Sequence, residues 1–211
     1  MSMKFYDCAT APSPRRVRIF AAEKEIRLPT VQVHLRDGEQ FTEAFRAINP
    51  DCTVPALVLD DGTVIADAVA ICGYLEELHP YPPLIGATSR ERAVVIALNR
   101  QIERDGFFAA MEAFRNVAKG LKGRALPGPH DYEQIPELAE RGRTRLENFY
   151  RAMDARLADR EFVAGSRYTI ADISTLVLTD FAGWAKLKPP DACANLGRWY
   201  AAVSTRPSAR A

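Results

Sequence analysis

The sequence lacks the paired cysteines and histidines that mark several common classes of site. Its four cysteines lie far apart and form no CxxC pair, which argues against a disulfide framework and a cysteine zinc site. The three histidines are equally scattered, so no metal-ligand spacing is present. Neither a GxGxxG nor a P-loop motif occurs, so no local motif supports nucleotide binding. We therefore expect reduced thiols, no metal, and no bound nucleotide.

Long hydrophobic runs and an excess of one charge are also missing. No apolar run is long enough to span a bilayer, and the first residues lack the pattern of a signal peptide. The 28 Lys plus Arg residues balance 27 Asp plus Glu residues, which favours neither nucleic acid nor an anionic membrane as a partner. A chain of 211 residues that is 47% hydrophobic is expected to be a globular, cytoplasmic protein with one large or two small domains.

The first part of the chain alternates strand and helix signals. Strands are expected at 5–6, 31–35, 56–59 and 64–66, and helices at 14–25, 41–47 and 67–78. The strand at 31–35 alternates apolar and polar residues, which indicates a half-buried strand. Between the last two strands, Asp61-Gly62 predicts a hairpin because glycine tolerates positive φ. The order predicts an α/β domain.

Beyond residue 79 the signals are helical. The proline-rich segment 79–83 ends the preceding helix and has the composition of a stiff connector. Helices are then expected at 89–119 and around 146–157, 173–184 and 196–203, with a loop at 120–136. We predict an α/β domain at 1–79, a linker at 80–86 and an all-helical domain at 87–211.

Several short motifs occur one after another along the chain. They are Arg16-Val17-Arg18-Ile19 with Glu23-Lys24, Asn49-Pro50, Val54-Pro55-Ala56-Leu57, Asp67-Ala68-Val69-Ala70-Ile71 with Tyr74-Leu75, Ala164-Gly165-Ser166, Thr169-Ile170-Ala171-Asp172, Arg198-Trp199-Tyr200 and Arg206-Pro207-Ser208. Over nearly its whole length the chain resembles the glutathione S-transferase superfamily. The resemblance implies a thioredoxin-like α/β N-terminal domain, an all-α C-terminal domain, glutathione as co-substrate, and a homodimer.

The resemblance also implies where glutathione binds. Val54-Pro55 is similar to the family's cis-proline turn, which exposes the backbone of Val54 as a strand edge that a peptide can join; the alternative is an ordinary trans turn. Asp67 matches the acidic position at a helix N-terminus that holds the γ-glutamyl end, and it can equally be an N-cap. Ala68 departs from the usual Ser or Thr, and a lost hydroxyl there costs about 1.5–3 kcal/mol of binding.

Further positions match those that contact the glycine end of glutathione. Gln40 aligns with such a position and can donate to a carboxylate. Cys52 aligns with another but is a poor substitute, so an inert thiol is the preferred interpretation. Thr53 offers a hydroxyl beside it.

The thiol-activating position is unusual. The family places a hydroxyl or thiol near the start of the first helix, where it stabilises the glutathione thiolate. An ungapped match puts Ala11 there, so the usual side chain is missing. Ser13 is the first candidate to replace it, followed by Thr10 and Cys8, and the backbone N–H of Ala11 or Ser13 is another. The alternatives are that Ser13 and Thr10 cap the helix and that Cys8 is a buried residue.

The long helix carries the candidates for the second-substrate pocket, expected between the domains. They are Phe107, Phe108, Met111, Phe114 and Arg115, with Trp184 as a further possibility. Aromatic and methionine side chains suit an apolar electrophile, although most of this stripe can equally be helical core. The cluster Arg15, Arg16 and Arg18 is expected on a solvated helix face or a dimer contact.

Three functions are compatible with these residues. The first is conjugation of glutathione to an apolar electrophile. The second is a glutathione-dependent disulfide reductase or peroxidase that uses Cys8. The third is a non-catalytic scaffold that acts through protein contacts, which the alanines at positions 11 and 68 favour.

Overall fold

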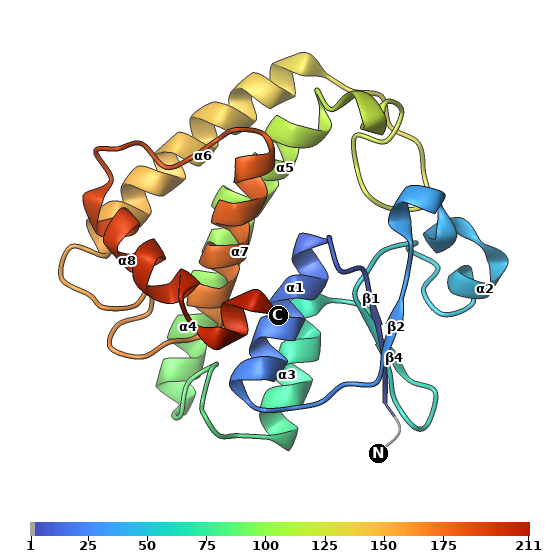
Figure 1. The fold of residues 1–211 in the computed structure, drawn as a ribbon, viewed down its shortest axis with the longest axis horizontal. Coiled ribbons are helices and arrows are strands. Elements are labelled where there is room, and N and C mark those ends of the chain that lie inside the picture. Colours follow the sequence, from blue (N-terminus) through green and yellow to red (C-terminus); the bar gives the residue numbers. More distant parts are fainter. Residues whose placement is uncertain (1–2) are drawn as a thin grey trace. The chain divides into compact units, whose positions relative to one another are not determined.

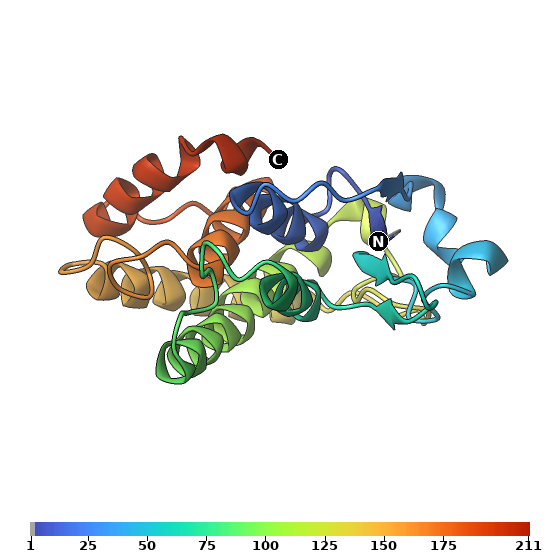
Figure 2. The same ribbon diagram turned by 90° about the horizontal axis from the view of Figure 1, so that it is seen from below.

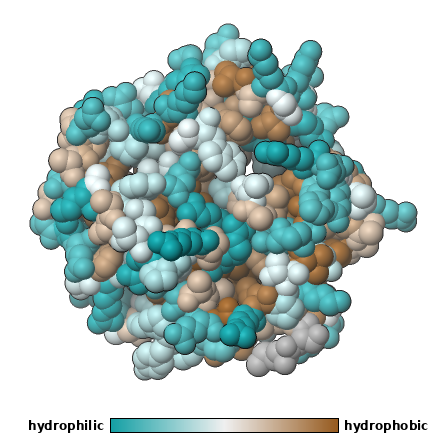
Figure 3. Space-filling view, in the orientation of Figure 1, coloured by the Kyte–Doolittle hydropathy of each residue, from teal (hydrophilic) through white to brown (hydrophobic). Residues whose placement is uncertain are grey.

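The computed structural model describes residues 3–211, which divide into two compact units. The first unit extends to Pro82 and includes Pro127–His130 and Ala211, and the second comprises Pro83–Leu126 and Asp131–Arg210. Within the described residues, no helix combines the length and the apolar character needed to cross a membrane. On the face shown in Figure 3, polar side chains cover most of the surface and apolar ones are interspersed among them.

The first unit is a four-stranded mixed sheet with helices on both faces. Its elements are β1 (Lys4–Asp7), α1 (Pro12–Glu23), β2 (Thr30–Gln32), α2 (Glu43–Arg46), β3 (Ala56–Val58), β4 (Val64–Ile65) and α3 (Ala68–Leu78). The strand order is β2-β1-β3-β4, with β1 parallel to β2 and antiparallel to β3. Helices α1 and α3 lie side by side on one face, and α2 lies on the other (Figure 1). This is the expected thioredoxin-like arrangement.

Three predicted element bounds in this unit are wrong. Strand β2 ends at Gln32 because a 3-10 turn begins at Leu35, and Val31 is exposed rather than half-buried. Helix α1 ends at Glu23. Two residues later Glu25 has a φ of +56°, which lies outside the range of a right-handed helix. The helix expected at 41–47 is interrupted at Thr42, whose extended backbone and side-chain cap start α2 anew after a 3-10 turn.

The predicted hairpin is confirmed. Strands β3 and β4 pair antiparallel, and the Leu59 N–H donates to the Thr63 carbonyl across the turn. Gly62 has a φ of +85°, which other residues rarely adopt. The Asp61 carboxylate accepts the Thr63 N–H and closes the turn.

The second unit is all-helical. Its α-helices are α4 (Ser89–Gln101), α5 (Phe108–Arg115), α6 (Pro136–Arg156), α7 (Ile170–Trp184) and α8 (Ala194–Ser204). Helix α7 has 12 buried residues out of 15, as a helix at the centre of a core requires. Helix α6 packs along α5, and α8 contacts both α6 and α7 (Figures 1 and 2).

The single helix predicted at 89–119 is also wrong in detail. A π-helical segment, Ile102–Phe107, separates α4 from α5, and the helix ends at Arg115. The backbone of this π-helical segment remains helical, so the spacing of apolar side chains in the sequence does not reveal its wider turn. The loop predicted at 120–136 contains a bridge between Arg124 and Tyr132, and its last residue, Pro136, is the first residue of α6.

A glycine in α6 permits the close packing of α5 against α6. A Cβ on Gly142 would lie 2.6 Å from the Ala109 carbonyl oxygen and 2.7 Å from the Ala113 nitrogen. We expect Gly142→Ala to lower the free energy of unfolding by about 1–3 kcal/mol, since two helix backbones must separate. Gly197→Ala in α8 is the matched control, because nothing lies within 4 Å of its added methyl. That variant should gain up to about 1 kcal/mol. Equal urea midpoints for the two variants would contradict this packing.

Candidate functional site

The topology brings the predicted glutathione-binding features to one end of the sheet. Tyr6 pairs with Ala56, and continuing this antiparallel register places Cys8 level with Val54. Leu57 pairs with Ile65, and the same continuation places Asp67 level with Pro55. The start of α1, the Val54–Pro55 turn and the start of α3 therefore lie at the carboxyl end of β1.

The Val54–Pro55 turn presents a free strand edge. Its peptide bond is cis, as predicted. Within residues 3–211, neither the N–H nor the C=O of Val54 makes a hydrogen bond. The preceding residue is held, because the Asn49 side chain donates to the Thr53 carbonyl (2.8 Å) and hydroxyl (3.2 Å). A fixed donor and acceptor pair is what an added peptide strand needs.

Asp67 is the N-cap of α3, which confirms the N-cap interpretation of this residue. Its Oδ1 accepts the N–H groups of Val69 (2.9 Å) and Ala70 (2.8 Å). Its Oδ2 makes no hydrogen bond in the described chain, and the residue is exposed. Ala68 is buried and offers only its backbone N–H, which also has no partner there. Capping thus leaves one carboxylate oxygen and one N–H for a ligand.

The start of α1 does not match the capping alternative. The N-cap is Ala11, and no side chain caps the helix, so Ser13 and Thr10 are not caps. The Ala11 N–H donates to the Cys8 carbonyl at 2.8 Å and is therefore already used. Ala11 thus cannot supply the backbone donor that the sequence left open.

Proline leaves a single backbone donor in the first turn of α1. Pro12 and Pro14 have no N–H, and the Arg15 N–H donates to the Ala11 carbonyl. The Ser13 N–H is left without a partner within residues 3–211, and so is the Ser13 hydroxyl. Both groups lie where the dipole of a 12-residue helix favours negative charge.

The other two candidates in this loop form a pair. Cys8 is buried, as its alternative interpretation required, while Thr10 is exposed. The Cys8 sulfur and the Thr10 hydroxyl lie 3.5 Å apart. The sulfur is therefore shielded from solvent beside a hydroxyl rather than paired with a second cysteine.

The arginine cluster in α1 does not form a solvated face, which is the first of the two alternatives that we expected. Arg16 is buried, and Arg18 is only 19% exposed, with its guanidinium against Asp7 at the end of β1. One signal for this contact is present in the sequence, since a carboxylate that ends a buried strand requires a partner. It did not identify which arginine supplies it.

The glycine-end candidates differ in their environments. Gln40 lies in the 3-10 turn Glu39–Phe41, and its Oε1 is buried without a hydrogen-bond partner. Cys52 is 4% exposed with a φ of +53°, and its thiol donates to the Pro50 carbonyl. This environment agrees with an inert thiol.

In the second unit, three of the candidate side chains form a half-buried stripe at helical spacing: Phe107, Met111 and Phe114. Phe108 is exposed. The ring of Phe114 contacts those of Phe181 and Trp184 edge to face, with centroids 5.7 and 6.1 Å away. Phe181 was missed, although it lies one turn before Trp184.

Arg115 differs from the other candidates of that stripe. Its guanidinium donates to the carbonyls of Arg124 and Ala125, at 2.5 and 3.1 Å. Burial, followed by the charge of Arg124, lowers the pKa of Arg115. The side chain therefore anchors the loop after α5.

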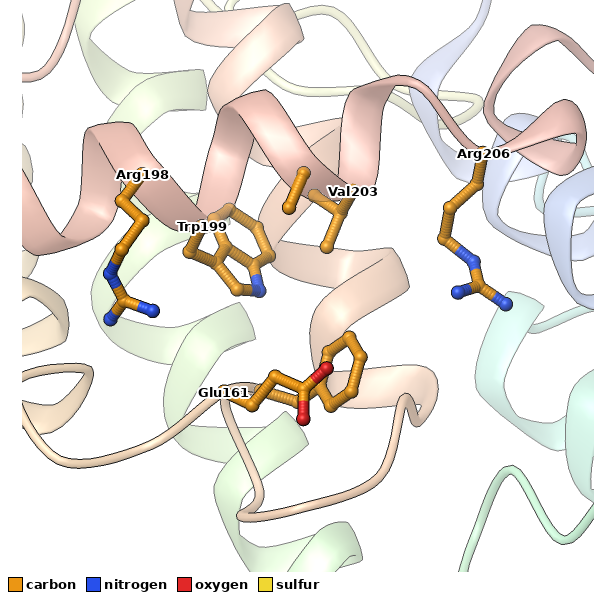
Figure 4. Close-up of a pocket in the computed structure, with 7 residues that line it drawn as sticks. Glu161, Arg198, Trp199, Val203 and Arg206 are labelled. Carbon is orange, nitrogen blue, oxygen red and sulfur yellow. The ribbon is translucent and has the colours of Figure 1, made fainter.

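A cavity within the second unit lies away from these candidates. It has a volume of about 260 Å³ and is lined by α8 and the segment after α6 (Figure 4). Arg198 and Trp199 belong to α8, Arg206 follows the end of that helix, and the Glu161 carboxylate lies opposite them. None of the predicted site residues lines it. Among residues 3–211, no cluster of His, Cys, Asp or Glu is arranged to hold a metal ion.

Comparison with known proteins identifies the family. Residues 10–78 match the model of the glutathione S-transferase N-terminal domain, and residues 98–207 match that of the C-terminal domain. The chain is 34% identical to glutathione S-transferase 2 of Saccharomyces cerevisiae over 99% of its own length and 88% of that protein. The chain belongs to the glutathione S-transferase superfamily.

Solved structures agree with this assignment. A glutathione S-transferase domain-containing protein of Marinobacter aquaeolei is 37% identical, with a TM-score of 0.90 over 97% of this chain and 98% of that one. Gtt2 of Saccharomyces cerevisiae is 34% identical, with a TM-score of 0.88 over 97% of both chains. The chain is accordingly a glutathione S-transferase-like enzyme.

Proposed function

We propose that this enzyme conjugates glutathione to an apolar electrophile. The observation that carries the proposal is the juxtaposition of three unsatisfied groups at the carboxyl end of β1. These groups are the strand edge at Val54, the N-terminus of α3 with Asp67, and the N-terminus of α1 with Ser13. Their order matches a tripeptide with an amino-acid head, a central amide and a thiol.

In this arrangement each group has a separate task. The Val54 backbone pairs with the cysteinyl part of glutathione as an added strand. Asp67 Oδ2 receives the γ-glutamyl ammonium, and the Ala68 N–H donates to the adjacent carboxylate. Gln40 and the Thr53 hydroxyl face the glycine end.

The Ser13 hydroxyl and N–H stabilise the glutathione sulfur as a thiolate. The thiol proton leaves to solvent, the sulfur attacks the electrophilic carbon, and the leaving group departs with its bonding electrons. The Thr10 hydroxyl lies beside the Cys8 sulfur in the same loop, and Cys8 remains shielded. The stripe around Phe114 supplies apolar contacts for the second substrate.

Asp67→Asn tests the binding mode. Asparagine is as good an N-cap as aspartate, so the thermal midpoint should stay within a few degrees of wild type. The ammonium of glutathione loses a charge-assisted partner, so its dissociation constant should rise about tenfold or more. Titration calorimetry measures the dissociation constant of glutathione for both proteins. An unchanged affinity would remove Asp67 from the site.

Ser13→Ala tests the thiol-activating group. Loss of a hydrogen bond to a charged sulfur should raise the pKa of bound glutathione by about one unit or more and lower kcat/KM near neutral pH about tenfold. The backbone N–H remains, so some turnover should persist. Thr10→Val is the matched control and should change kcat/KM less than threefold. If Thr10→Val lowered kcat/KM more than Ser13→Ala does, the Thr10 hydroxyl and not that of Ser13 would be the thiol-activating group.

We also propose that the enzyme works in the cytoplasm as a homodimer. The four cysteines are free, in agreement with a reducing compartment. The dimer rests on family membership, and sedimentation analysis measures it directly.

A further inference from the structure

The loop between β1 and α1 is clamped from both sides by side chains that lie outside the glutathione-binding groups. Its backbone at Ala9 is held twice: the N–H donates to Gln32 Oε1 at 3.0 Å, and the carbonyl accepts from Arg18 Nη2 at 2.9 Å. Arg18 Nη1 also reaches the Cys8 carbonyl at 3.4 Å. The loop is therefore fixed by long-range contacts.

Asp7 bonds both clamping side chains, so that Asp7, Arg18, the Ala9 backbone and Gln32 form a closed ring of hydrogen bonds. The residue is 2% exposed at the end of β1, and its register partner in the parallel strand β2 is Gln32. One carboxylate oxygen pairs with Arg18 at 2.5 Å, and the other accepts the Gln32 amide at 2.8 Å. Both clamping side chains are thus oriented by the same buried carboxylate.

The ring determines where the thiol-activating groups lie. The loop runs from Cys8 directly into the N-cap Ala11, whose N–H bonds the Cys8 carbonyl. A shift of Ala9 therefore moves the first turn of α1 relative to the strand edge at Val54. Displacing a reacting group by about 1 Å can cost two orders of magnitude in rate.

We propose that Asp7, Arg18 and Gln32 are positioning residues that hold the β1–α1 loop in register with the glutathione-binding edge. The inference rests on the proposed function. The ring touches neither the Val54 backbone nor Asp67, so it acts on the placement of the first helical turn more than on the capture of glutathione.

Two variants break the clamp at different points without removing Asp7. Arg18→Lys keeps a cation for the carboxylate but lacks the planar fork that also reaches Ala9. Gln32→Ala removes the opposite contact from an exposed strand position. Arg27→Lys, at an exposed position beyond α1, is the matched control.

Both clamp variants should bind glutathione within about threefold of wild type by calorimetry. Their kcat with a common electrophile should fall about tenfold, and the thiolate absorbance of bound glutathione should titrate at higher pH. Because both act on Ala9, the double variant should lose less than the product of the two single effects. Arg27→Lys should match wild type throughout.

The outcomes separate the inference from the function on which it rests. A wild-type protein that binds no glutathione overturns the proposed function. A wild-type protein that binds and turns over, with kcat and thiol titration unchanged in both clamp variants, overturns the positioning role alone. Loss of affinity equal to the loss of kcat in both clamp variants also overturns it, since that pattern assigns the ring to binding.

Discussion

Asp172→Ala should lower the free energy of unfolding by about 4–5 kcal/mol. The carboxylate is fully buried at the start of α7, where it accepts four hydrogen bonds from three residues. The donors are the Val163 N–H, the Thr169 N–H and hydroxyl, and the Trp199 indole, at 2.8–3.1 Å. Alanine leaves these buried donors without an acceptor, and each orphaned group costs about 1–3 kcal/mol.

Trp199→Phe is the matched control for that variant. It removes one donor and keeps the ring in the core, so a loss of about 1–2 kcal/mol is expected. Urea denaturation near pH 5 compares the three proteins. If both variants lost the same free energy of unfolding, the hydrogen bonds from Val163 and Thr169 to the carboxylate would contribute nothing to stability.

The effect of Asp172 should also depend on pH. Burial is the largest influence and raises the pKa of its carboxyl from 3.8 to about 6, against the opposing donors from Val163, Trp199 and Thr169. Because the folded carboxyl keeps its proton where the unfolded one has lost it, its contribution to stability is complete below about pH 4 and declines up to about pH 6. The gap in unfolding free energy between wild type and Asp172→Ala should therefore narrow by more than about 1 kcal/mol from pH 4.5 to pH 7.

Lys24→Met should lower the free energy of unfolding by about 3–5 kcal/mol. The Lys24 side chain is fully buried, with its ammonium 2.7 Å from Glu76 and 2.6 Å from the carbonyls of His79 and Pro82. Methionine leaves a buried carboxylate without this cation. The pair joins the carboxyl-terminal ends of α1 and α3, whose amino-terminal ends carry Ser13 and Asp67.

Two comparisons test this interpretation. Lys24→Met combined with Glu76→Leu should recover part of the loss, because both charges are then removed. Arg151→Met breaks the exposed pair with Glu147 on α6 and should cost less than about 1 kcal/mol. If Lys24→Met lowered the urea midpoint of unfolding as little as Arg151→Met does, the buried ion pair would not hold the two helix ends together.

The sequence predicted the parts of this fold that depend on local chemistry. Asp61-Gly62 required a tight turn, and the motif Thr169-Ile170-Ala171-Asp172 forms a capping box at the start of α7. The indole of Trp199, 27 residues away, was invisible because no local pattern links it to that carboxylate. The π-helical turn before Phe108 was missed for a related reason, since helical periodicity continues through it.

The candidate site shows the same division. Val54-Pro55 and Asp67 could be proposed because each lies in a short motif that resembles the family's, and the structure has the cis peptide bond and the N-cap that these motifs predict. Arg18 was expected on a solvated face or at a dimer contact, since adjacency to other arginines says nothing about a carboxylate on a neighbouring strand. The sequence could propose Ser13 but not exclude its capping role, which depends on where the helix begins.

Calorimetric titration of wild-type protein with glutathione tests the central claim most directly. The account predicts saturable heat at or below millimolar glutathione, with a dissociation constant about tenfold or more higher for Asp67→Asn. Absence of heat from the wild-type protein at millimolar glutathione would contradict it.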